Sequence, residues 1–89
     1  MARRDDQLLE FPCRFAIKAM GLAEDNFDAL VVSLVRRHVD DLDEGAVNSK
    51  PSSAGKYISV TVTIEAQNRE QLDDIYRSLH AHERVLMAL

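Results

Sequence analysis

The amino-acid sequence predicts an α+β domain with a ferredoxin-like βαββαβ order, in which a four-stranded antiparallel sheet carries two helices on one face. Two segments with alternating apolar residues, two with apolar residues at helical spacing and a short apolar C-terminal segment predict this order. A chain of 89 residues has room for one domain. We expect residues 1–7 to form a flexible polar tail and residues 8–89 to form the domain.

The first and third expected strands carry the clearest alternation. They span residues 13–20, with Gly21 expected to end the strand, and residues 56–66, which are rich in β-branched residues. Since side chains alternate between the two faces of a strand, one side of each should face the helices. The residues expected on that side are Phe15, Ile17, Ala19, Ile58, Val60, Val62 and Ile64.

Two segments have the periodicity of amphipathic helices, residues 25–39 and residues 68–81. We expect the side chain of Asp25 or Asn26 to cap the first helix. Asn68 followed by Gln71 fits a capping box at the start of the second.

The two remaining strands are expected to be short. Residues 46–50, within a polar stretch rich in Asp, Ser and Asn, should form a strand at an edge of the sheet. Residues 85–89 should form the last strand. We expect Val85, Met87 and Leu89 to face the helices, which places Leu86 on the open face of the sheet.

Composition excludes several classes of function. A net charge of −4 disfavours general binding to nucleic acid or to an anionic membrane. No apolar run approaches the roughly 20 residues of a transmembrane helix. One cysteine, Cys13, leaves no internal disulfide and fits a reducing compartment, so we expect a cytoplasmic protein.

Catalytic and metal-binding patterns are weak. His80 and His82 point to different sides of a helix, and the acidic run 40–44 lacks the pattern of a calcium loop. No base is fixed by sequence beside Cys13 or the Ser52–Ser53 pair. We therefore expect no enzymatic activity, no cofactor and no metal.

The segment 49–56 is one candidate ligand site. Ammonium groups, hydroxyls and turn amides could converge there on a phosphate or carboxylate, although the segment is not a P-loop. A solvated hairpin connection is the alternative. The candidate ligand-binding residues are Lys50, Ser52, Ser53, Gly55 and Lys56.

The open face of the sheet is a candidate partner interface, formed by Arg14, Lys18, Tyr57 and Leu86. A mixed face of this kind can pack against a partner protein. The alternative is an ordinary surface, because isolated apolar residues are common on protein surfaces.

Several short motifs resemble the YbeD family of small bacterial proteins. They are residues 8–13 (Leu-Leu-Glu-Phe-Pro-Cys), 18–21 (Lys-Ala-Met-Gly), 50–57 (Lys-Pro-Ser-Ser-Ala-Gly-Lys-Tyr) and 85–89 (Val-Leu-Met-Ala-Leu). The resemblance covers residues 8–89 and implies a ferredoxin-like fold similar to ACT domains, which sense amino acids. ACT domains commonly bind ligands near a glycine after the first strand, often at a dimer interface. The resemblance thus implies Gly21 as a ligand-binding position and suggests a homodimer.

These observations lead to one main functional expectation and two alternatives. We expect a non-enzymatic regulatory or binding module of ACT-like fold that senses a small metabolite, with neither nucleic acid nor membrane as partner. The first alternative is a protein-interaction subunit that docks through the open face or through the edge strand near Val47. The second is an anion-dependent enzyme centred on residues 50–56, with His38 as a candidate base.

Overall fold

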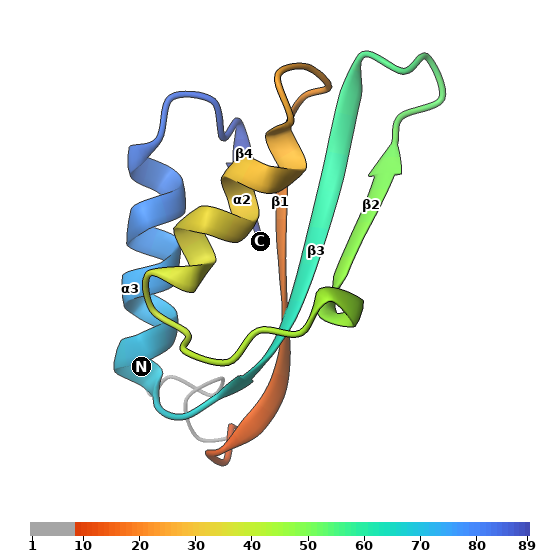
Figure 1. Ribbon diagram of the computed structural model, residues 1–89. Helices are drawn as coiled ribbons and strands as arrows, with labels where there is room; N and C mark the ends of the chain where they lie inside the picture. Colours follow the sequence, from red (N-terminus) through yellow and green to blue (C-terminus); the bar gives the residue numbers. More distant parts are fainter. Residues whose placement is uncertain (1–8) are drawn as a thin grey trace.

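The computed structural model describes residues 9–89 and confirms the α+β, ferredoxin-like fold, with helices on one side of a sheet (Figure 1). Its elements are β1 (Cys13–Leu22), α2 (Phe27–Arg36), a 3₁₀ turn η1 (Glu44–Ala46), β2 (Val47–Pro51), β3 (Tyr57–Ala66), α3 (Arg69–Ala81) and β4 (Met87–Ala88). The expected tail, residues 1–7, lies outside the described residues. Among the described residues, no helix is long and apolar enough to cross a membrane.

The four strands form one sheet in the order β2-β3-β1-β4, with every neighbouring pair antiparallel. β1 and β3 pair over their full length, from Cys13 opposite Ala66 to Leu22 opposite Tyr57. β2 is an edge strand, as expected. β4 forms the other edge and pairs with β1 only at Ala19 and Met20.

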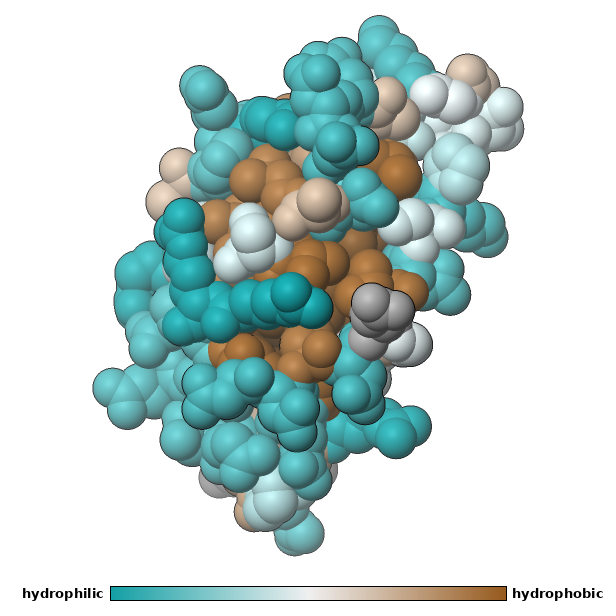
Figure 2. Space-filling model, in the orientation of Figure 1, coloured by the Kyte–Doolittle hydropathy of each residue, from teal (hydrophilic) through white to brown (hydrophobic). Residues whose placement is uncertain are grey.

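The hydrophobic core lies between the sheet and the two helices. Ile17 and Val62, which are opposite each other in the sheet, are both fully buried, as are Ile75 and Leu79 of α3. The alternation of apolar residues in β1 and β3 is therefore confirmed as a core-facing pattern. Figure 2 shows the helix side of the molecule, where apolar residues are visible between polar ones. In Figure 1 no helix lies in front of β2.

None of the described helices packs on the opposite side of the sheet, which we call the open face (Figure 1). The alternation of the strands and their register assign its residues. They are Arg14, Ala16, Lys18, Met20, Leu22, Asn48, Lys50, Tyr57, Ser59, Thr61, Thr63, Glu65, Met87 and Leu89.

The start of α2 differs from the prediction. Asn26 has a left-handed backbone (φ 53°) and makes no side-chain capping bond, although its carbonyl accepts a hydrogen bond from the Leu30 amide at 3.1 Å. The helix is also shorter than expected, because it begins at Phe27 and ends at Arg36. The cap of α3 is as expected, with Asn68 Oδ1 accepting from the Gln71 amide at 2.8 Å.

The sequence predicts that the first strand ends at Gly21, but β1 extends one residue further. The strand continues to Leu22 because Tyr57 of β3 extends far enough to pair with it. The ladder is prolonged by a hydrogen bond of 2.9 Å from the Ala23 amide to the Lys56 carbonyl. The local signal of a glycine was therefore overridden by pairing with a long neighbouring strand.

The orientation of the last strand was also wrong. Met87 pairs with Met20 on the open face, and Leu89 is 68% exposed, whereas Ala88 lies opposite Ala19 and packs against the core. Val85 packs against the core, as expected. A shift of one residue turns every side chain of a strand to the other face, and a two-residue strand gives little pattern to fix the register.

Candidate functional site

Exposed apolar side chains gather at one end of the open face. In the part of the chain that the structure describes, the exposed large hydrophobic residues are Leu22 (38%), Tyr57 (37%), Leu86 (58%), Met87 (51%) and Leu89 (68%). Leu22 lies opposite Tyr57, and Met87 lies opposite Met20. We call these five residues together with Met20 the apolar patch. It crosses three neighbouring strands, β3, β1 and β4.

The strand ends and the C-terminal segment hold the patch in place through main-chain bonds. The Leu86 amide donates to the Met20 carbonyl at 2.8 Å. Lys18 and Leu89 exchange two hydrogen bonds, at 3.1 Å and 2.8 Å. The patch is therefore built on backbone that is hydrogen-bonded between neighbouring segments.

The remainder of the open face is polar and basic. Arg14 and Lys18 project from β1 and Lys50 from β2, while hydroxyl side chains line β3. Glu65 is the only acidic residue in the four described strands, although the whole chain carries a net charge of −4. Lys56 adds a further cation, with its Nζ 5.6 Å from the centre of the Tyr57 ring. The open face thus has the opposite sign of charge to the protein as a whole.

A small hollow of about 210 Å³ adjoins the patch, lined by Leu22, Leu86, Glu24, Glu83 and Arg84. The Arg84 guanidinium donates a hydrogen bond to the Glu24 carbonyl and lies 5.8 Å from the centre of the Phe27 ring. Arg84 thereby ties the segment before β4 to the connection that follows β1.

Gly21, the position implied for a ligand, is buried beneath side chains of the protein itself. A Cβ atom there would lie 2.5 Å from Phe27 Cε1 and 2.6 Å from the Arg84 carbonyl oxygen. Contacts that short are repulsive, so the glycine is required for close packing. The space at the Cβ position of Gly21 is therefore filled by the Phe27 ring and the Arg84 carbonyl.

The predicted anion-binding residues Lys50, Ser52, Ser53, Gly55 and Lys56 are exposed in and beside the β2–β3 hairpin. Ser52 donates its amide to the Tyr57 carbonyl at 2.8 Å and accepts from the Tyr57 amide through Oγ at 3.1 Å. The Gly55 amide donates to the Ser52 carbonyl at 2.9 Å. These polar groups close the hairpin, which favours a structural connection over an anion site.

His38, the candidate base of the enzyme alternative, lies in the helical layer. Its Nε2 is 2.8 Å from Ser78 Oγ, and Gln71 Nε2 donates to its carbonyl at 2.9 Å. In Figure 1 the end of α2 is far from the β2–β3 hairpin. The structure therefore does not bring His38 together with Lys50 and Lys56.

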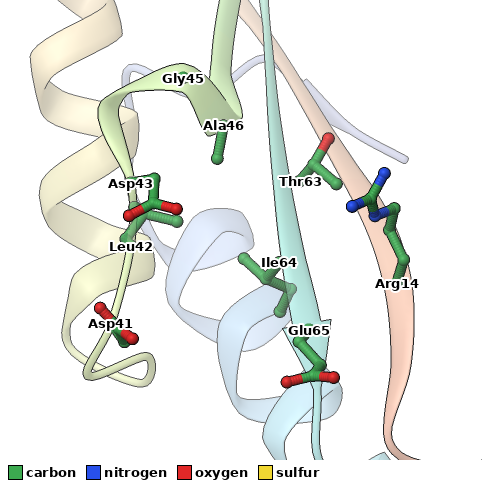
Figure 3. Close-up of a pocket in the computed structure, with 9 residues that line it drawn as sticks. All are labelled: Arg14, Asp41, Leu42, Asp43, Gly45, Ala46, Thr63, Ile64 and Glu65. Carbon is green, nitrogen blue, oxygen red and sulfur yellow. The ribbon is translucent and has the colours of Figure 1, made fainter.

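A second hollow, of about 610 Å³, lies between the segment 41–46 and β3 (Figure 3). Figure 3 shows Asp41 and Asp43 on one side and Arg14, Thr63 and Glu65 on the other. Its lining is mainly polar, so it offers little apolar surface for a ligand. Among the side chains that the structure describes, no group of three from His, Cys, Asp or Glu is arranged to hold a metal ion.

The structure places three of the four residues expected at a partner interface on one face of the sheet, with Arg14 at the opposite end from Tyr57. Arg14, Lys18 and Tyr57 share the open face, and Leu86 lies beside it in the segment before β4. Sequence reasoning missed Leu22, because Gly21 was expected to end the strand. It also missed Met87 and Leu89, because the last strand was placed with the wrong face inward. The small Ala88, suited to packing beside Ala19, was the signal that could have corrected the register.

The fold and this surface define a class of protein: a small two-layer α+β domain of ferredoxin-like topology in which the described helices cover one face of the sheet. Residues 6–89 match the family described as "Protein of unknown function (DUF493)", and the chain belongs to that family. The resemblance to the YbeD family is confirmed.

The curated relatives are similar over nearly their whole length. The chain is 45% identical over 84 residues to a UPF0250 protein of Janthinobacterium sp. (strain Marseille), covering 94% of this chain and 92% of that protein. It is 44% identical over 89 residues to a UPF0250 protein of Paraburkholderia phytofirmans, covering 100% of both. With the UPF0250 protein NMB1218 of Neisseria meningitidis serogroup B, it shares 43% identity over 82 residues, or 92% of this chain and 90% of that protein.

Proposed function

We propose that this chain is a non-enzymatic protein-binding module that docks on a partner protein through its open face. The observation that carries the proposal is the apolar patch, in which the exposed large hydrophobic residues of the described part of the chain gather at one end of the open face and along its β4 edge. Apolar groups scattered singly on a surface need no explanation, but a contiguous group with a polar border is typical of an interaction site.

The anatomy of the open face supports binding to a protein. The apolar patch supplies methionine, leucine and tyrosine side chains that would lose water on contact, and methionine side chains adapt to irregular surfaces. Lys18, Lys50 and the strand-β3 hydroxyls border it. An apolar centre with a polar border is the usual composition of a protein interface.

Metabolite sensing, suggested by the resemblance to ACT domains, is the alternative. It has less support from the described residues, since Phe27 and Arg84 fill the space at Gly21. A titration of labelled protein with pools of amino acids and nucleotides distinguishes the two functions. Amide shifts centred on Gly21 or on Ser52 to Lys56 would favour sensing.

Site-specific cross-linking in living bacteria tests the protein-binding proposal. A photo-reactive amino acid is placed at Met87 or Ser59 of the open face and, as a control, at the exposed Ala29 of α2. We expect both open-face positions to form one and the same covalent adduct with another protein and Ala29 to form none. Absence of an adduct from the open face, or an adduct from Ala29 alone, would overturn the proposal.

A further inference from the structure

The shape and charge of the open face specify what it binds. Resting on the proposed function, we propose that the partner presents an amphipathic helix whose apolar stripe is flanked by Asp and Glu side chains. The helix packs on the apolar patch with its axis along the strands, and its acidic flanks meet Lys18, Lys50 and Lys56.

A partner on this face has to bind through side chains. β1 and β3 are the inner strands of the sheet, so their main-chain groups are directed to neighbouring strands rather than toward the face. Addition of a strand to a sheet edge would use main-chain bonds instead, and the apolar patch would take no part in it. An amphipathic helix satisfies its own main chain and presents one apolar stripe.

The dimensions of the patch match one helix. It extends over three strands, from Tyr57 of β3 through Met20 of β1 to Met87 of β4. Two spacings between neighbouring strands are about 10 Å, and a helix with its side chains is about 10 Å wide. A docked helix would also give the sheet a second covered face, which completes a three-layer arrangement.

The charges around the apolar patch indicate which residues flank the apolar stripe of the partner helix. Lys18 adjoins Leu89 in the sheet, Lys50 lies opposite Ser59, and Lys56 is beside the Tyr57 ring. Cations thus border the patch along β1 and at the β2–β3 hairpin. On the remaining side, Glu24, Glu83 and Arg84 give a border of mixed charge. Acidic flanks therefore complement two sides of the patch, whereas basic flanks would be repelled there.

The same observations disfavour two other occupants. A second copy stacked face to face would bring the basic residues of both open faces together, which costs interaction energy. Single-stranded nucleic acid needs aromatic rings for base stacking, and the patch offers Tyr57 among leucines and methionines.

Two model peptides of about 18 residues, roughly five helical turns, test the inference. Both carry the same leucine and methionine stripe, but one has glutamate flanks and the other lysine flanks. Each is titrated into labelled full-length protein and followed by two-dimensional amide NMR. We expect the glutamate peptide to shift the amides of Lys18, Met20, Ser59 and Met87 and to bind at least about threefold more tightly than the lysine peptide, since exposed ion pairs each contribute only modestly.

A charge-reversed protein is the matched control. In the double variant Lys18→Glu/Lys50→Glu the preference should invert, so that the lysine peptide binds more tightly, while the circular dichroism spectrum stays unchanged. Equal binding of the two peptides, no binding of either at millimolar concentration, or shifts confined to α2 and α3 would overturn the inference. So would tighter binding of an oligonucleotide to the open face, or a stable dimer that Met87→Ser abolishes.

These outcomes are separable from those of the cross-linking experiment. If open-face adducts form but their partner segment is not an acidic amphipathic helix, the inference fails and the proposed function stands. If no open-face adduct forms, the proposed function itself fails.

Discussion

Gly21 shows how one residue decides the shape of the candidate site. It is buried in β1, where the Phe27 ring and the Arg84 carbonyl approach closer than a side chain would allow. Phe27 begins α2, and Arg84 precedes β4. Packing on the glycine therefore brings together the first connection and the C-terminal segment, and this contact supports the side of the patch formed by Leu22 and Leu86.

Replacing Gly21 with alanine should destabilise the fold. The Cβ would sit 2.6 Å from the Arg84 carbonyl oxygen, which belongs to the backbone and cannot rotate away. We expect a loss of about 1–3 kcal/mol in the free energy of unfolding, as for other overpacked sites. Urea denaturation measures it. Gly45→Ala is the control, because nothing lies within 4 Å of a Cβ at that position; an equal loss in both variants would contradict the packing explanation.

At the level of a secondary-structure element, β4 depends on contacts from outside its own two residues. Besides the main-chain bonds with β1, the Tyr76 hydroxyl of α3 donates to the main-chain oxygen of Leu89 at 2.7 Å. Leu89 and Met87 belong to the apolar patch, so α3 positions part of the open face through the sheet edge. A short strand with few bonds of its own should open locally before the rest of the sheet.

Tyr76→Phe should loosen β4 without disturbing the rest of the fold. The ring remains, including its edge-to-face contact with Phe15 at 6.5 Å between centres, and only the hydrogen bond is lost. We expect about 1 kcal/mol less stability. Hydrogen exchange should become faster at the Lys18 and Leu89 amides, while the amides between β1 and β3 keep their protection. Unchanged exchange at Leu89 would show that Tyr76 does not hold the strand.

Because of the same hydroxyl, the free energy of unfolding should depend on pH in the alkaline range. Desolvation raises the pKa of Tyr76 above its ordinary value of 10.0. The stabilisation is thus fully present below pH 10 and is lost as the pH rises through the folded-state pKa, because the unfolded chain releases the proton first. Between pH 9 and 11 the stability of the parent protein should fall more steeply than that of Tyr76→Phe. Parallel curves would contradict this linkage.

The molecule as a whole is a two-layer structure with a single core on one side of its sheet. Side chains between the layers are buried, whereas those of the apolar patch are exposed. The two faces of the sheet should therefore have different roles. The covered face stabilises the fold, and the open face is available for binding.

A pair of identical substitutions tests this division. Leu79→Ala removes a fully buried side chain and should cost about 2–5 kcal/mol of unfolding free energy. Leu86→Ala removes a side chain that is 58% exposed and should change stability by less than about 0.5 kcal/mol. Thermal and urea denaturation provide both values. A large loss in Leu86→Ala would mean that the patch is part of the folding core rather than a free surface.

The sequence alone determined the fold, because apolar residues at periods of two and of about 3.6 identify strands and helices without knowledge of their partners. It also placed Arg14, Lys18 and Tyr57 on the same face of the sheet, since β1 and β3 are long enough to fix their own alternation. Asn68 could be recognised as a cap because capping is a local interaction.

The apolar patch was decided by contacts between distant segments. Leu22 joined β1 because Tyr57 pairs with it, and Met87 and Leu89 turned outward because Ala88 lies opposite Ala19. Gly21 became a packing residue because Phe27 and Arg84 meet over it. Register and close packing depend on partners that are far apart along the chain, so no local pattern of residues specifies them.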